Sequence, residues 1–182
     1  MEYLAHIADD GREQTVGEHL RSAAEYSSRA LAPAGLCEAG YLCALLHDCG
    51  KYTELFDRYI HSNGEMRRGS VNHTFSGVRL IMERCHNEPP ASTRDIFGEL
   101  LAYAVGAHHG EFDIADEDGK NGFFHRMKKE DIGYEEAVSN YTELREDSRE
   151  IFHSFSFLHD FYTALSAVCL LYTSDAADDL IG

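Results

Sequence analysis

Residues 37–48 restrict the fold more than any other part of this 182-residue chain. They have helical spacing and are apolar on almost all sides, as Tyr41, Leu45 and Leu46 illustrate. A helix of this kind is stable only when other elements cover it on every side. The chain is long enough to form one such buried core. We therefore expect this segment to be the central helix of a single domain, and Gly50 to end it.

Helical spacing continues on both sides of this segment. Thr15 and Glu18 form the capping-box pattern T-x-x-E, which predicts a helix from there to about residue 30. The expected inward face of that helix is Val16, Leu20 and Ala23, with His19 as a further candidate. Other helices are expected at about residues 53–60, 73–85, 92–108, 134–153 and 157–171, with an exposed acidic loop at 110–122. No alternating apolar and polar run is long enough to compete as a strand, so the expected fold class is all-α.

Acidic residues outnumber basic residues two to one, with 32 Asp and Glu against 16 Lys and Arg and a net charge of −16. This balance argues against a protein that holds nucleic acid by its bulk charge, but not against an enzyme that contacts phosphates through metal ions. The five cysteines contain no C-x-x-C pair, which favours a reducing cytoplasm over a disulfide framework. No signal peptide and no membrane span are expected.

The chain contains 11 histidines, and a surplus of imidazole in an acidic chain indicates transition-metal binding. The candidate site residues, most of them at or near expected helix ends, are His19, His47, Asp48, His73, His108 and His109. An adjacent His-Asp pair allows one metal to take both groups, or allows the carboxylate to reach a second ion. Lys51 follows closely, and an ammonium group stabilises the negative charge that builds in phosphoryl transfer.

Five short stretches carry a resemblance to a known family: YLAH at 3–6, EHL at 18–20, LLHDCGK at 45–51, NHTFSG at 72–77 and AHHG at 107–110. In order and spacing they resemble the HD-domain nuclease of type I CRISPR systems, the nuclease part of the CRISPR-associated nuclease-helicase. That nuclease belongs to the HD metal-dependent phosphohydrolase superfamily. The resemblance covers about residues 3–168 and implies a compact multi-helix HD fold with a histidine-rich metal site.

The resemblance also implies a ligand set. One divalent ion would be held by His19, His47 and Asp48, and a second by Asp48, His73, His108 and His109. Asp48 and Lys51 would be the catalytic residues, with Lys51 either facing the scissile phosphate or orienting Asp48. Histidine-rich ligation favours two transition-metal ions (Mn, Fe, Ni or Co) over Mg. His6 is interpreted as a supporting or structural residue, and Thr74 stands where the family usually has Ser.

Residues 169–182 depart from the family pattern. Relatives have a further metal-binding Asp shortly after the position of Ser166, but from Cys169 this chain reads CLLYTSDAAD. That string corresponds to the in-frame translation of an adapter used in transposon-based sequencing. We therefore interpret residues 1–168 as the HD nuclease domain and 169–182 as a non-native tail, in which case the first metal lacks an anionic ligand. The alternative is that Asp175 or Asp178 is the final ligand.

These features predict a cytoplasmic, metal-dependent endonuclease or exonuclease that hydrolyses single-stranded DNA in antiviral defence. The resemblance implies a helicase, fused or separate, and the RNA-guided CRISPR surveillance complex as partners. Arg67-Arg68 and the basic residues at 126–129 either guide the strand or are ordinary solvated surface. Two alternatives remain, an HD phosphohydrolase acting on nucleotides or cyclic dinucleotides, and an inactive metal-stabilised docking module.

Overall fold

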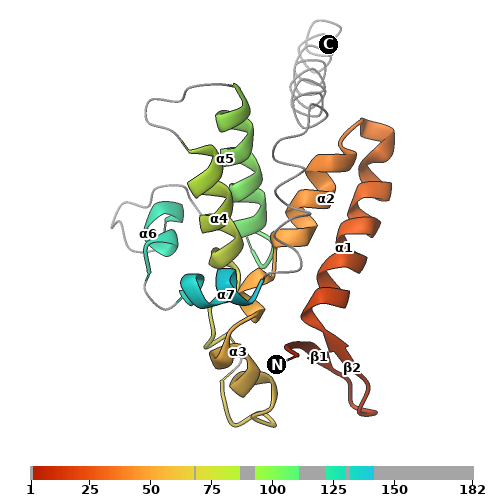
Figure 1. Cartoon of the computed structure of the whole chain (residues 1–182), viewed down its shortest axis with the longest axis vertical. Helices are drawn as coiled ribbons and strands as arrows, with labels where there is room; N and C mark the ends of the chain where they lie inside the picture. Colours follow the sequence, from red (N-terminus) through yellow and green to blue (C-terminus); the bar gives the residue numbers. More distant parts are fainter. Residues whose placement is uncertain (1, 68, 87–92, 111–121, 130–131, 142–182) are drawn as a thin grey trace, which may run out of the picture.

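Two helix pairs form most of the core (Figure 1). The computed structural model describes residues 2–67, 69–86, 93–110, 122–129 and 132–141. In the first pair α1 (Val16–Leu31) packs on α2 (Cys37–Leu46), and in the second α4 (Phe75–Cys85) packs on α5 (Thr93–Gly106). The pairs meet because α2 also contacts α5. The mainly helical prediction is confirmed, and the helices at 53–60, 73–85 and 92–108 are present within a few residues.

The capping box at the start of α1 is present in full. The Thr15 hydroxyl accepts a hydrogen bond from the Glu18 amide, and the Glu18 side chain accepts one from the Thr15 amide. These bonds satisfy amide groups that the first turn of a helix leaves without partners. The inward face carries Val16, Leu20 and Ala24, so the prediction of Ala23 was wrong by one position. Ala23 is only partly buried.

The predicted central position of α2 is confirmed, because α1 and α5 both pack against it. Leu42, Leu45 and Leu46 are completely buried. The helix ends at Leu46, and Gly50 lies beyond it in the short 3₁₀ turn η2 (Cys49–Lys51). The expectation that Gly50 ends the helix is therefore wrong. Its position instead requires glycine because an added Cβ would lie 2.2 Å from the His73 carbonyl oxygen.

A short antiparallel hairpin precedes α1 and corrects the expectation that no strand is present. It pairs β1 (Leu4–Ile7) with β2 (Glu13–Thr15), with an irregularity in register between Leu4 and His6. Strands of four and three residues are too short to give a readable alternation in sequence. Because β2 runs directly into α1, the hairpin places His6 beside the first turns of that helix.

The remaining described elements surround the ends of the two helix pairs. They are the 3₁₀ turn η1 (Ala32–Ala34), α3 (Glu54–Ile60), α6 (Phe123–Met127) and α7 (Tyr134–Asn140). Both α6 and α7 contact α4, and α6 was not predicted. The expected 134–153 helix begins at Tyr134 but ends at Asn140, with the described Tyr141 as its C-cap, and residues 142–153 lie outside the described residues. Most of the expected 110–122 loop, the expected 157–171 helix and the tail at 169–182 lie outside the described residues. No helix in the described part of the chain is long and apolar enough to cross a membrane.

Candidate metal centre

Chain turns at helix ends bring the candidate side chains to one place. His47 caps the C-terminus of α2, and Asp48 follows it directly before η2. His73 comes two residues before α4, and His108 and His109 come two and three residues after the end of α5. Only His19 lies within a helix, one turn into α1. The packing of α1 on α2 and of α4 on α5 therefore places these groups around Asp48.

Asp48 lies at the centre of the cluster and is 4% exposed. Its Oδ2 is 3.2 Å from Nε2 of both His19 and His47. Its Oδ1 is 3.2 Å from Nε2 of His108 and 3.5 Å from Nε2 of His73. One carboxylate thus faces two groups of histidines, one on each oxygen.

The ligand atoms form two groups that share Asp48. One is His19, His47 and Asp48, and the other is Asp48, His73, His108 and His109. Within each group one donor atom per residue can be chosen so that all lie within 4.8 Å of one another. These are the two sets that the family resemblance implied, and the structure brings all six residues together.

The tautomers of three histidines follow from their backbone contacts. Nδ1 lies 2.6 Å from the Ala44 carbonyl in His47, 3.1 Å from the Val71 carbonyl in His73 and 2.7 Å from the Val105 carbonyl in His108. A carbonyl accepts a hydrogen bond, so each Nδ1 carries the proton and donates it. In the neutral ring Nε2 then presents a lone pair toward Asp48.

Several of the ring nitrogens converge on one another. Nε2 of His73 lies 3.0 Å from Nε2 of His109, and Nε2 of His19 lies 3.3 Å from Nε2 of His47. Within the described residues, Oδ1 of Asp48 is buried without a hydrogen-bond partner. Converging imidazole nitrogens and a buried carboxylate oxygen are the donor set that divalent transition metals prefer. The residues present therefore fit divalent metal ions.

The protonation states of Asp48, His73 and His109 suit a metal-binding site, whereas at His47 the lowering effect of burial is outweighed by Asp48 and the Ala44 carbonyl, which raise its pKa. Burial alone would raise the pKa of Asp48, but the close contacts of His108, His19 and His47 with its carboxylate outweigh that effect and hold the pKa far below the usual range. Burial lowers the pKa of His73 to about 4. Burial, together with the neighbouring His108, also lowers the pKa of His109. At neutral pH Asp48 is an anion and His73 and His109 are neutral, as metal binding requires.

Lys51 is buried beside Asp48, with its Nζ 2.9 Å from Oδ2. Of the two roles considered for Lys51, this contact supports the one in which Lys51 orients Asp48. Phe56 of α3 packs against both Lys51 and His73. Its ring centroid is 5.3 Å from Nζ of Lys51 and 5.3 Å from the centroid of the His73 ring. Sequence analysis missed Phe56, the buried residue of a short helix that follows the LLHDCGK motif.

Replacing Lys51 with Met keeps the side-chain length and removes the charge. We expect the free energy of unfolding to fall by about 2 kcal/mol in chelator-treated protein, because the buried Asp48 carboxylate loses its ammonium partner. Added Mn²⁺ should recover part of this loss, since a cation again faces the carboxylate. Urea unfolding followed by circular dichroism, with chelator and with Mn²⁺, measures both values. The exposed Lys128→Met is the matched control, and equal stability of the two variants would contradict the pairing.

Of the other described histidines, His6 is the one that contacts the cluster. The His6 ring packs edge-on against His19 with centroids 4.8 Å apart, which fits its predicted supporting place. His61 Nδ1 contacts the Asp57 carbonyl, and His86 pairs with Glu99 at 2.7 Å. His125 is exposed. His153, His159, Asp175 and Asp178 lie outside the described residues.

The sequence of the chain matches that of a known protein family. Residues 16–151 match the sequence model of the HD domain, which is most of the chain. This protein belongs to the HD domain family, whose members are generally metal-dependent phosphohydrolases. No curated protein matches the chain. Divalent ions bound by such a His/Asp cluster supply activation of water and stabilisation of the leaving oxygen in phosphoester hydrolysis.

Proposed function

We propose that this chain is a metal-dependent nuclease that hydrolyses phosphodiester bonds of single-stranded DNA as part of type I CRISPR interference. The observation that carries the proposal is one carboxylate, Asp48, shared by two groups of histidines. Such an arrangement suits two ions held close together, and a pair of ions can stabilise both the attacking and the leaving oxygen of an in-line displacement at a phosphodiester. The choice of substrate and system is supported by the five sequence stretches that resemble the CRISPR nuclease.

Each residue has a distinct task in this proposal. His19 and His47 would hold one ion, and His73, His108 and His109 would hold the other, with Asp48 between them. Lys51 would keep Asp48 oriented through its contact with Oδ2. The backbone carbonyls of Ala44, Val71 and Val105 fix the histidine tautomers. Five nitrogen donors against one carboxylate favour Mn, Fe, Ni or Co over Mg.

The proposed partners rest on the family resemblance, and the charge of the chain supports the need for them. With a net charge of −16, it is not expected to hold a long strand by bulk electrostatics. A helicase, fused or separate, would deliver single-stranded DNA to the metals. The RNA-guided surveillance complex would recruit the pair to its target.

The test is cleavage of circular single-stranded DNA by the purified chain supplied with Mn²⁺, Co²⁺ or Ni²⁺. We expect nicking of the circle, abolished by chelator, with no turnover of nucleotides or cyclic dinucleotides. Cleavage of linear strands alone would make the enzyme an exonuclease. Turnover of nucleotides or cyclic dinucleotides without DNA cleavage would favour the other phosphohydrolase class. Bound metal with no turnover of any of these substrates would favour the inactive docking module.

A further inference from the structure

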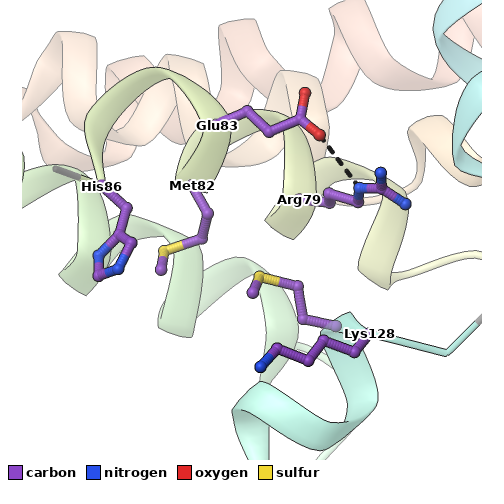
Figure 2. A pocket seen from close by; sticks show the side chains of 6 residues that line it. Arg79, Met82, Glu83, His86 and Lys128 are labelled. Atoms are coloured by element: carbon purple, nitrogen blue, oxygen red, sulfur yellow. Dashed lines mark hydrogen bonds and ion pairs between the residues drawn. The ribbon is translucent and has the colours of Figure 1, made fainter. Parts of the chain in front are cut away.

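Helix α7 connects α4 to the segment that carries Lys51, and it lies beside α4 in Figure 1. At its first residue the Tyr134 hydroxyl donates a hydrogen bond to Glu83 of α4. The guanidinium carbon of Arg79 lies 4.3 Å from the centroid of the Tyr134 ring. Arg79 also pairs with Glu83 at 3.1 Å, as Figure 2 shows. These contacts hold the N-terminal end of α7 on α4.

The face of α7 that carries Glu136 and Asn140 holds the residues that follow Lys51. Oε1 of Glu136 accepts a hydrogen bond of 2.8 Å from the Glu54 amide. Nδ2 of Asn140 donates a hydrogen bond of 3.0 Å to the Tyr52 carbonyl. The two side chains are four residues apart, so they lie on one face of the helix. Because Tyr52 directly follows Lys51, Asn140 holds the backbone next to that lysine.

The Asn140 amide also reaches the N-terminal hairpin. Its Nδ2 lies 2.9 Å from the hydroxyl of Tyr3, the residue before β1. A side-chain amide has two N–H groups, so Nδ2 can donate one to the Tyr52 carbonyl and the other to the Tyr3 hydroxyl. The rings of Tyr3 and Tyr52 pack edge-on with centroids 5.8 Å apart. One amide therefore joins the residue before β1 to the residue after η2, and we call these contacts the Tyr3–Asn140–Tyr52 bridge.

Tyr3 is in turn bonded to the helix that carries His19. Its backbone carbonyl accepts a hydrogen bond of 2.9 Å from the amide of Val16, the first residue of α1. His19 lies three residues further along the same helix. A shift of Tyr3 therefore moves the start of α1, and with it the His19 ring.

We propose that Asn140 is a positioning residue for the metal-binding group on Oδ2 of Asp48. Nε2 of His19 lies 3.2 Å and Nζ of Lys51 lies 2.9 Å from this oxygen. Asn140 sets how the segments that carry these two contacts lie relative to each other, and it acts through the two tyrosines that it joins. The inference rests on the two-ion arrangement of the proposed function but not on its DNA substrate.

The group on Oδ1 of Asp48 gives the proposal its selectivity. His73 precedes α4, and His108 and His109 follow α5. In the described part of the chain, the side-chain hydrogen bonds of Asn140 go to the hairpin and to the end of η2 rather than to these segments. Loss of Asn140 should therefore affect one ion and spare the other.

The test is titration of the full chain with Co²⁺, followed by visible absorption, which reports binding without any substrate. The parent should bind two ions. Asn140→Leu keeps the size of the side chain and removes both N–H donors. It should bind one ion about tenfold more weakly, since loss of a residue that supports metal ligands costs about 10–100-fold, and the other ion with unchanged affinity. Two unchanged affinities would overturn the proposal, as would equal losses at both ions.

Tyr3→Phe removes one half of the bridge and keeps the ring against Tyr52. It should weaken the same ion by about threefold, less than the full loss of a supporting residue, and an unchanged affinity would count against the bridge. Residues that act as one unit are not additive, so Tyr3→Phe should have no further effect in Asn140→Leu. Independent losses that add in the double variant would overturn the bridge.

Tyr134→Phe is the matched control, because it removes a hydrogen bond that holds the same helix on α4. We expect a lower midpoint of urea unfolding but both Co²⁺ affinities within about twofold of the parent, as for independent sites. If Tyr134→Phe weakened one ion as much as Asn140→Leu does, general loosening of α7 would explain the loss and the positioning role would be overturned.

His19→Ala and His109→Ala identify the ion concerned. The ion weakened in Asn140→Leu should be the one lost in His19→Ala and retained in His109→Ala. The reverse assignment would overturn the proposal.

Hydrolysis of single-stranded DNA and of the small diester bis(p-nitrophenyl) phosphate distinguishes this inference from the proposed function. If the parent binds two ions that respond as expected but hydrolyses neither substrate, the proposed nuclease function fails and the role of Asn140 stands. If the parent cleaves DNA and Asn140→Leu binds both ions like the parent, only the inference about Asn140 fails. A parent that binds fewer than two ions would overturn both.

Discussion

Replacing Asp48 with alanine is expected to abolish phosphodiester hydrolysis and to lower bound metal. Each carboxylate oxygen faces a different group of histidines at 3.2 to 3.5 Å, so its loss affects both groups. Loss of residues that merely support metal ligands costs about 10–100-fold, and the loss of a shared ligand should exceed 100-fold. The measurements are initial rates on single-stranded DNA and on bis(p-nitrophenyl) phosphate, with metal content by elemental analysis after dialysis.

Asp57→Ala is the matched control for this variant. Asp57 is a partly buried aspartate on α3, and it belongs to neither metal-binding group. Its replacement should leave metal content unchanged and the rate close to that of the parent. If Asp48→Ala kept both the parent rate and the parent metal content, Asp48 would not be a shared ligand.

Gly50→Ala is expected to be the most destabilising single change at the site. The new Cβ would lie 2.2 Å from the His73 carbonyl oxygen, and that carbonyl accepts the Gly50 amide at 3.1 Å. A backbone atom cannot rotate away as a side chain can, so η2 and the segment before α4 must separate. Overpacking usually costs about 1–3 kcal/mol, and we expect about 3 kcal/mol here because the nearest atoms all belong to the His73 backbone.

The same separation should move His73 away from Asp48 and weaken metal binding. Urea unfolding and metal titration of the variant measure the two effects. Gly11→Ala is the control: Gly11 has φ of +83° and no atom near its added Cβ, so only the backbone strain of about 1 kcal/mol applies. If Gly50→Ala were no more destabilising than Gly11→Ala, the close approach would not constrain the site.

Gly77, like Gly50, lies where an added Cβ would meet the backbone of another element, here between the two helix pairs. An added Cβ would lie 2.0 Å from the Leu46 carbonyl oxygen, at the end of α2. The start of α4 therefore lies directly against the turn that carries His47 and Asp48. Since His73 precedes the same helix, this contact explains how His73 shares one site with His47 and Asp48, which lie 26 and 25 positions earlier in the chain.

Local signals predicted the helices well where they were complete. The capping box at Thr15 and Glu18 marked the start of α1, and the all-round apolar pattern marked α2 as central. The hairpin and α6 were missed because three to five residues carry too little periodicity. Gly50 was misinterpreted because a helix-ending glycine and a glycine required by close packing look the same in sequence.

The sequence by itself determined which groups were available: neutral imidazoles, one carboxylate beside them and a lysine one turn later. It also determined that these groups lie near helix ends, because capping and apolar periodicity are properties of neighbouring residues. Only the tertiary structure decided that His73 meets His109 at 3.0 Å and that Oδ1 and Oδ2 of Asp48 face different histidine groups. It also decided that Arg126 and Lys129 lie on a cavity that His73 and His109 line as well. These contacts depend on how α1, α2, α4 and α5 pack. Packing brings together residues that are far apart along the chain, and their separation in sequence does not predict their distance in space.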